Sequence, residues 1–135
     1  MKTFYSHTKN ITGGKRIGSK LLRVHTGGVT QKALAQHCPS AFSQNLSDFL
    51  TQIGLYHDLG KYTPHFQRYL LDLGGFDPEL KQHAKFGAFT LFQKIWHNQG
   101  AAADAMLAFY IILHHHADLS DFDNIKIMAE ADGKE

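Results

Sequence analysis

A chain of 135 residues that is 43% hydrophobic has room for one domain with its own core. Its 14 basic and 12 acidic residues give a formal net charge of +2, which argues against a polybasic nucleic-acid wrapper and against an acidic disordered tail. The single cysteine cannot form an internal disulfide, which excludes a disulfide-stabilised extracellular scaffold.

The first 28 residues hold five of the 12 glycines among basic residues, and no alternation of apolar and polar side chains persists. We therefore predict an irregular N-terminal segment without strands. The N-terminus lacks the apolar segment of a signal peptide, and the longest apolar run, 105–113, is far shorter than the ~20 residues that span a bilayer. The sequence predicts a cytoplasmic protein that does not contact a membrane.

Helical spacing of apolar residues recurs after this segment and predicts an all-α fold of one domain, 1–135. Thr63 followed by Pro64 is typical of a helix N-cap and first helical position, and the pair Gly74-Gly75 is expected to end that helix. The last predicted helix is almost entirely apolar, as expected at the centre of a bundle. The predicted helices cover 29–38, 46–60, 64–73, 78–97 and 101–116.

Histidine is unusually abundant, with 10 in 135 residues, and such an excess usually has a chemical explanation. The pair His57-Asp58 closes a predicted helix, where adjacent side chains point about 100° apart and can reach a metal from two sides of one pocket. Lys61 lies one turn further on, where it can neutralise Asp58 or a substrate phosphate. Taken alone, the pair is more typical of a helix-end histidine beside a solvated aspartate than of a metal site.

Three other histidine positions bear on the site. The run 114–116 closes the apolar helix; complementing the helix dipole explains one histidine there but not three, which favours a functional role. His83 lies on an apolar face, where a hydrogen-bonded core histidine is the commoner case, although Gly87 one turn later permits a close backbone approach. His25 alone indicates nothing.

The order of these residues changes the interpretation. A histidine, a His-Asp pair, another histidine and a His-His pair, each on its own helix, can converge on a two-metal centre that Asp58 bridges. Nitrogen-rich sites with a bridging carboxylate suit Mn, Fe, Co, Ni or Zn better than Ca. Two ions about 4 Å apart activate water and stabilise a leaving oxygen, which is phosphoester chemistry.

Five segments carry a family resemblance: 5–8, 21–29, 56–70, 81–88 and 112–119. The most specific is Tyr56-His57-Asp58-Leu59-Gly60-Lys61-Tyr62-Thr63-Pro64-x-Phe66-Gln67. With these motifs the sequence resembles the HD superfamily of metal-dependent phosphohydrolases, and within it the HD nuclease domain of the CRISPR-associated nuclease–helicases of type I systems. Other HD enzymes share the His-Asp pair and the lysine but rarely the Thr-Pro-x-Phe-Gln continuation.

The resemblance implies an HD-domain helical bundle with a central metal site that holds two divalent ions, drawn from Mn, Ni, Co, Fe or Mg. It assigns Lys61 to steadying Asp58 or the scissile phosphate, so that Asp58 and Lys61 are the implied catalytic residues. His7 matches a motif histidine with a structural role. The implied ligands are His25, His57 and Asp58 for one metal, and His83, His115 and His116 with bridging Asp58 for the other.

The family pattern also includes a late aspartate from a helix well downstream of the His-His pair. The candidates by residue type are Asp118, Asp121, Asp123 and Asp132, and all lie too near His116 to match that helix. We therefore expect an HD domain that is incomplete at its C-terminus. No Walker-type phosphate-binding motif occurs, so a helicase partner would be a separate chain.

The resemblance predicts a nuclease that cuts single-stranded DNA in CRISPR interference, together with a separate helicase subunit and the CRISPR surveillance complex. An HD phosphohydrolase acting on nucleotides or cyclic dinucleotides stays open, and so does an inactive metal-binding adaptor. Basic residues before His25 allow either a strand-binding lip beside the metals or a solvated loop; they are Lys9, Lys15, Arg16, Lys20 and Arg23.

Overall fold

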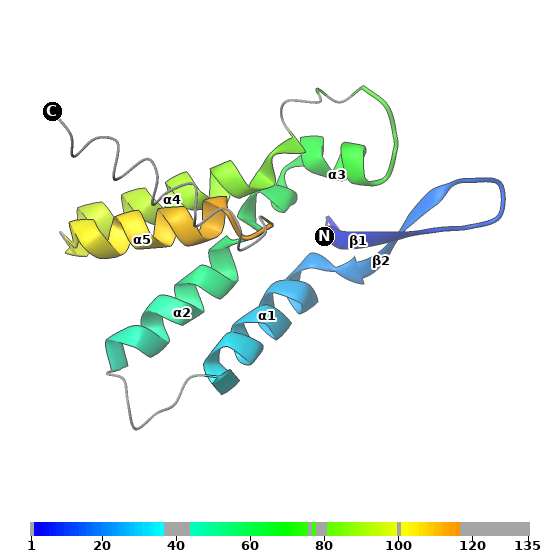
Figure 1. Cartoon of the computed structure of the whole chain (residues 1–135). Helices are drawn as coiled ribbons and strands as arrows, with labels where there is room; N and C mark the ends of the chain where they lie inside the picture. The colour runs from blue at the N-terminus through cyan, green and yellow to red at the C-terminus, as the bar shows by residue number, and fades with distance from the viewer. Residues whose placement is uncertain (1, 37–43, 76, 78–80, 100, 117–135) are drawn as a thin grey trace, which may run out of the picture.

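A computed structural model describes residues 2–36, 44–75, 77, 81–99 and 101–116. Figure 1 shows two pairs of neighbouring helices, α1 with α2 and α4 with α5, and a β-hairpin that extends away from them. The elements are β1 (Tyr5–Asn10), β2 (Arg16–Leu21), α1 (Leu22–Gln36), α2 (Gln44–Tyr56), the 3-10 helix η1 (Leu59–Tyr62), α3 (Pro64–Leu70), α4 (His83–Gln99) and α5 (Ala102–Leu113).

The described part of the chain is mainly α-helical, which confirms the class predicted from the spacing of apolar residues, apart from one two-stranded sheet. None of the described helices combines the length and the apolar character that a bilayer span requires.

The prediction of an irregular N-terminus without strands is wrong. β1 and β2 pair antiparallel, with Tyr5 opposite Leu21 and Asn10 opposite Arg16. The register shifts on either side of His7, which breaks the two-residue alternation by which strands are recognised in a sequence. Gly18 allows the ring of Tyr5 to cross the hairpin, because a Cβ there would collide with that ring.

The first helix begins at Leu22, seven residues before the predicted start at 29. Its buried residues are Leu22, Thr26 and Thr30, spaced four apart, and two of the three are polar. Their hydroxyls donate to backbone carbonyls one turn back, so the threonines are buried with their hydrogen bonds made. A buried face built from threonine gives no hydrophobic periodicity, which is why the sequence did not reveal this turn of helix. Cys38 and Pro39, at the predicted end, lie outside the described residues.

The second predicted helix is shorter than expected, because α2 ends at Tyr56 and not at Gly60. The backbone N–H of Lys61 donates to Asp58 O at 2.9 Å, an i→i+3 bond that tightens the chain into η1. His57 and Asp58 therefore lie in a turn between α2 and η1 rather than on a helix.

The fourth and fifth predicted helices are also shorter than expected. α4 begins at His83, and Lys81 and Gln82 before it are not α-helical; Pro78, the predicted start, lies outside the described residues. α5 ends at Leu113, so that the three histidines 114–116 occupy a turn after it. These ends place His83 at the first position of α4 and the other three histidines just beyond the end of α5.

The start of α3 agrees with the sequence prediction. The Thr63 hydroxyl accepts a hydrogen bond from Phe66 N at 3.2 Å, and Pro64 is the first helical residue. The helix ends at Leu70, slightly before the predicted 73. Gly74 and Gly75 follow with φ of 69° and 61°, a left-handed conformation that suits glycine.

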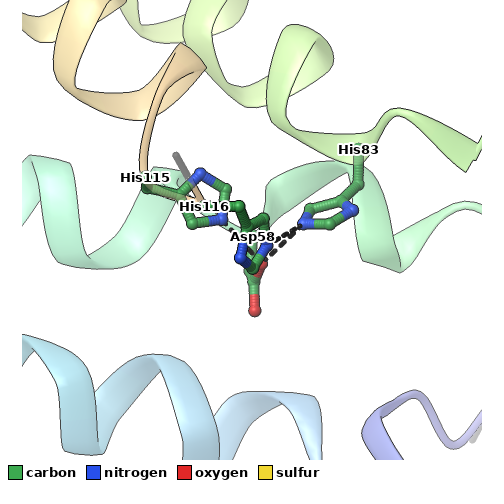
Figure 2. Close-up of side chains that lie close together, drawn as sticks. All are labelled: Asp58, His83, His115 and His116. Atoms are coloured by element: carbon green, nitrogen blue, oxygen red, sulfur yellow. Dashed lines mark hydrogen bonds and ion pairs between the residues drawn. The ribbon is translucent and has the colours of Figure 1, made fainter. Parts of the chain in front are cut away.

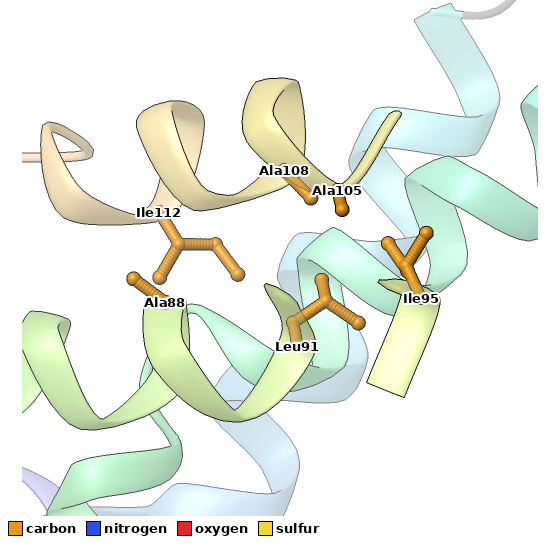
Figure 3. Packing of buried hydrophobic residues seen from close by; sticks show 6 residues of the cluster. All are labelled: Ala88, Leu91, Ile95, Ala105, Ala108 and Ile112. Carbon is orange, nitrogen blue, oxygen red and sulfur yellow. The ribbon is translucent and has the colours of Figure 1, made fainter. Parts of the chain in front are cut away.

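The hydrophobic core lies between α4 and α5 (Figure 3), where small residues of one helix face larger ones of the other. The opposite side of α5 is less buried than the centre of a bundle would be: Met106 and Leu107 are 57% and 50% exposed within the described residues. The buried cluster consists of Ala88, Leu91 and Ile95 from α4 and Ala105, Ala108 and Ile112 from α5.

Two glycines bring α4 against the chain that leads to Asp58. A Cβ at Gly87 would collide with the carbonyl oxygen of Tyr56, and one at Gly60 would collide with the backbone of His83. Backbone atoms cannot move aside as side-chain ends do, so both contacts require glycine. These contacts hold the turn that carries Asp58 directly against the start of α4.

We expect Gly87→Ala to lower the free energy of unfolding by about 1–3 kcal/mol, the usual cost of overpacking. Gly28→Ala is the matched control, because a Cβ at Gly28 meets no described atom within 4 Å and alanine favours the helix interior. It should raise stability by about 0.5–1 kcal/mol. Chemical denaturation of the two variants checks this, and equal midpoints would contradict the close approach of α4 to Tyr56.

Candidate metal centre

Asp58 lies at the meeting point of four parts of the chain and is fully buried. Two groups of side chains around it have donor atoms that all lie within 4.8 Å of one another, so that each group can hold a metal ion. The larger group is Asp58, His83, His115 and His116, and the smaller is His25, His57 and Asp58.

The larger group forms around Oδ1 of Asp58 (Figure 2). This oxygen lies 3.2 Å from Nε2 of His83 and 3.6 Å from Nε2 of His115. His116 completes the group through its Nε2, which is 3.0 Å from that of His83. Residues from the end of α5 and the start of α4 thus converge on one carboxylate oxygen.

The smaller group forms around the other carboxylate oxygen, Oδ2. It lies 3.1 Å from Nε2 of His25, 3.5 Å from Nε2 of His57, and 2.9 Å from Nζ of Lys61, which donates a hydrogen bond to it. Each oxygen of Asp58 thus faces a different group of histidines. Lys61 is itself buried, at 7% exposure.

Two of the histidines have their ring tautomer fixed by the backbone. Nδ1 of His57 lies 2.9 Å from Gly54 O, and Nδ1 of His115 lies 2.6 Å from Ile112 O. A carbonyl oxygen only accepts, so Nδ1 must carry the proton in each ring and Nε2 of the neutral ring presents a lone pair. This is the arrangement of metal-ligating histidines, whose second nitrogen donates to a backbone carbonyl.

Two buried atoms of the centre have no hydrogen-bond partner among the described residues: Oδ1 of Asp58 and Nε2 of His115. Both are acceptors in the neutral-histidine form, and they face each other at 3.6 Å. Unpaired buried acceptors are costly, and a cation between them would satisfy both lone pairs. The residues present therefore fit a divalent metal ion.

Burial and neighbouring charge keep the groups in the protonation states that metal binding needs. Burial lowers the pKa of His25 and of His57, and it lowers the pKa of His116 to about 4, with the neighbouring His115 and His83 adding to the shift. Burial alone would raise the pKa of Asp58, but the nearby His115, His83 and Lys61 outweigh it and hold that pKa well below its usual range. At neutral pH these shifts favour the neutral imidazoles of His25, His57 and His116 and the ionised carboxylate of Asp58.

These shifts predict that the metal-free protein is unstable in acid. From pH 6.5 down to about 4 the unfolded chain binds more protons at His25, His57 and His116 than the folded chain does, so the free energy of unfolding falls as the pH falls. Asp58 extends this fall below about pH 4, because its folded pKa is lowered. Urea denaturation in chelator between pH 7.5 and 5 should show a falling midpoint, less steep in His57→Gln. A midpoint that rises towards acid would contradict the assignment.

Gln67 supports the centre, although sequence reasoning gave it no role. Its Nε2 donates to the carbonyl oxygens of Lys61 and Tyr5, both at 2.8 Å, and its Oε1 accepts from Tyr5 N at 2.9 Å. Gln67 thus joins η1 to the first strand. The sequence did point to this residue, because Gln67 ends the Thr-Pro-x-Phe-Gln motif in the most specific segment of the resemblance. Its side chain is buried.

The structure leaves two other histidines of the sequence analysis outside the two groups. His7 is not in either group; its ring contacts that of His25 edge-on, with centroids 5.0 Å apart, and its Nδ1 lies 2.9 Å from the Ser6 hydroxyl. His114 is also outside both groups and packs against Tyr110. The late aspartate candidates, Asp118, Asp121, Asp123 and Asp132, lie outside the described residues.

Comparison with known proteins gives one partial match. The CRISPR-associated nuclease/helicase Cas3 of Haloferax volcanii is 33% identical to this chain over 73 residues. The chain is thus a partial relative of Cas3. The matched residues make up 54% of this chain but only 8% of Cas3, so the similarity concerns a small part of that longer protein. No protein-family model matches the chain, and no solved structure matches it.

Proposed function

We propose that the chain is an HD-type nuclease domain that uses two divalent metal ions to cut single-stranded DNA in type I CRISPR interference. The observation that carries this proposal is the pair of His/Asp groups that share the two oxygens of one buried aspartate. The partial similarity to Cas3, a nuclease/helicase, supports phosphodiester hydrolysis over other metal chemistry. In this proposal a separate helicase subunit and the surveillance complex deliver the strand, in the cytoplasm.

Divalent ions at the two groups would supply Lewis acidity, which polarises a phosphodiester and makes water easier to deprotonate. The chain's own residues prepare the centre for them. Asp58 would be a ligand common to both ions, and the carbonyls of Gly54 and Ile112 would keep the Nε2 lone pairs of His57 and His115 available. No side chain needs to form a covalent intermediate.

Lys61 has two roles in this mechanism. Its ammonium group donates to Oδ2 of Asp58 at 2.9 Å, which fixes the orientation of the carboxylate. Its positive charge lies beside the centre, where negative charge develops on a phosphodiester as the transition state forms. The buried position strengthens this interaction, because screening by water is weak there.

A cleavage assay tests the proposal. The purified chain is incubated with end-labelled single strands and Mn, Ni, Co or Mg, with and without chelator. We expect shortened products only when metal is present, and much slower cleavage of duplex DNA. Nucleotide and cyclic-dinucleotide substrates are run in parallel: their hydrolysis without strand cleavage would replace the nuclease proposal, and activity that persists in chelator would contradict metal dependence.

A further inference from the structure

The positive charge of the chain is concentrated at its N-terminal end. Seven of the 14 lysines and arginines precede Asp48, which is the first of the 12 acidic residues. The hairpin and α1 therefore carry only basic charges, while the rest of the chain is acidic on balance. A basic surface of this kind attracts the phosphates of a nucleic acid.

The hairpin displays part of this charge away from the helices. Figure 1 shows its turn extending well beyond α1 and α3. Gly13 and Gly14, with φ of 87° and 77°, form the turn, and the exposed residues Lys15 and Arg16 follow it. The cations at the turn are thus open to solvent and to a ligand.

A pocket of about 370 Å³ lies at the other end of the hairpin, where the strands meet α1. Phe4 and Tyr62 line it, with ring centroids 5.4 Å apart, and the basic residues Lys2 and Arg23 are also in its lining. Aromatic faces beside cations are what a nucleotide of a single strand requires, because the base stacks and the phosphate pairs with charge. Thr3 and Leu21 complete the lining.

This pocket is connected to the metal centre by short covalent and hydrogen-bonded links. Tyr62 directly follows Lys61 in η1, and Lys61 contacts Asp58. Gln67 holds the backbone of Lys61 and that of Tyr5 together, which fixes the first strand against η1. The pocket and the centre thus share η1 as a common support.

We propose that this pocket and the basic turn of the hairpin form the binding surface for single-stranded nucleic acid. One base stacks on Phe4 and Tyr62, its phosphates pair with Lys2 and Arg23, and the neighbouring strand follows the hairpin to Lys15 and Arg16. This inference rests on the proposed function, because it takes the substrate to be a single strand. The paired aromatic rings favour nucleic acid over a membrane surface or an acidic protein.

The test measures binding of a labelled homopolymeric single strand by fluorescence anisotropy. The measurement is made over a range of salt concentrations, once with metal and once with chelator. Arg23→Gln should weaken binding about fivefold at 0.1 M salt and reduce the log–log salt slope by about 0.7. Lys32→Gln is the matched control on the same helix and should change neither. Lys15→Gln/Arg16→Gln should weaken binding about 20-fold, and its control, Lys32→Gln/Lys94→Gln, should not.

Phe4→Leu removes one ring without changing the charge and should weaken binding about fivefold or more, with the salt slope unchanged. Equal affinities for the pocket variants and their controls would overturn the proposal. Complete displacement of the strand by anionic vesicles at equal phosphate concentration would also overturn it. If the predicted binding pattern appears without any cleavage, the nuclease proposal fails and this one stands. If the chain cleaves DNA but all three variants bind the strand as tightly as the unchanged chain, the nuclease proposal stands and the proposed binding surface is wrong.

Discussion

Asp58→Asn is expected to abolish binding of both metal ions and, with it, DNA cleavage. The substitution keeps the shape of the side chain but removes the negative charge that both groups of histidines share. Loss of an outer-shell partner alone costs about 10- to 100-fold in metal affinity, so loss of a ligand common to both groups should cost more. Metal titration by calorimetry and the cleavage assay measure the two effects separately.

Asp104→Asn is the matched control for this variant. Asp104 is exposed in the first turn of α5 and belongs to neither group, so its loss should leave metal binding and cleavage unchanged. Circular dichroism should show that both variants remain helical. Cleavage by Asp58→Asn at the wild-type rate would indicate a contaminating nuclease or a different active site.

The second large effect concerns the order in which the two groups take up metal. We expect one tight equivalent and a much weaker second one, with the group of His83, His115 and His116 filling first. Together with Asp58 this group offers four donor atoms, enough for a four-coordinate site, whereas the described residues of the other group offer three. A second ion would also have to share a carboxylate already neutralised by the first.

Variants separate the two groups in this experiment. His116→Ala should remove the tight calorimetric event, and His25→Ala should spare it. His114→Ala is the control, because this histidine adjoins the larger group in sequence but contributes no donor to it. Two equally tight events, or a tight event that disappears with His25 and persists without His116, would contradict the assignment.

The histidines that lie around Asp58 in the structure are the ones that the sequence motifs singled out. His57, Asp58 and Lys61 are close in the chain, so their mutual proximity follows from local geometry alone. The helical class and the cap at Thr63 could also be predicted, because apolar spacing and capping chemistry are local properties. The approach of His25 and His83 depends on tertiary packing, and it was indicated by the order of the histidines in the chain and by the family resemblance.

The features that could not be predicted from the sequence have one thing in common: none of them leaves a regular pattern of apolar residues. The start of α1 is hidden because Thr26 and Thr30 occupy its buried face, so no apolar stripe marks the helix. The hairpin is hidden because its register shifts near His7 and interrupts the alternation. Single-residue polar contacts such as those of Gln67 leave no periodic signal at all, since their partners are backbone atoms in other elements.

The amide of Gln67 also has a dynamic consequence. Its three hydrogen bonds couple the opening of the first strand to the loosening of η1, because each segment is held by contacts to the same side chain. We therefore expect anything that rigidifies η1 from the other side, through Lys61 and Asp58, to slow hydrogen exchange at the Tyr5 amide, although that amide is not in either group of ligands. The Tyr5 N–H thus acts as a reporter of events at the centre, readable by exchange measurements without any substrate.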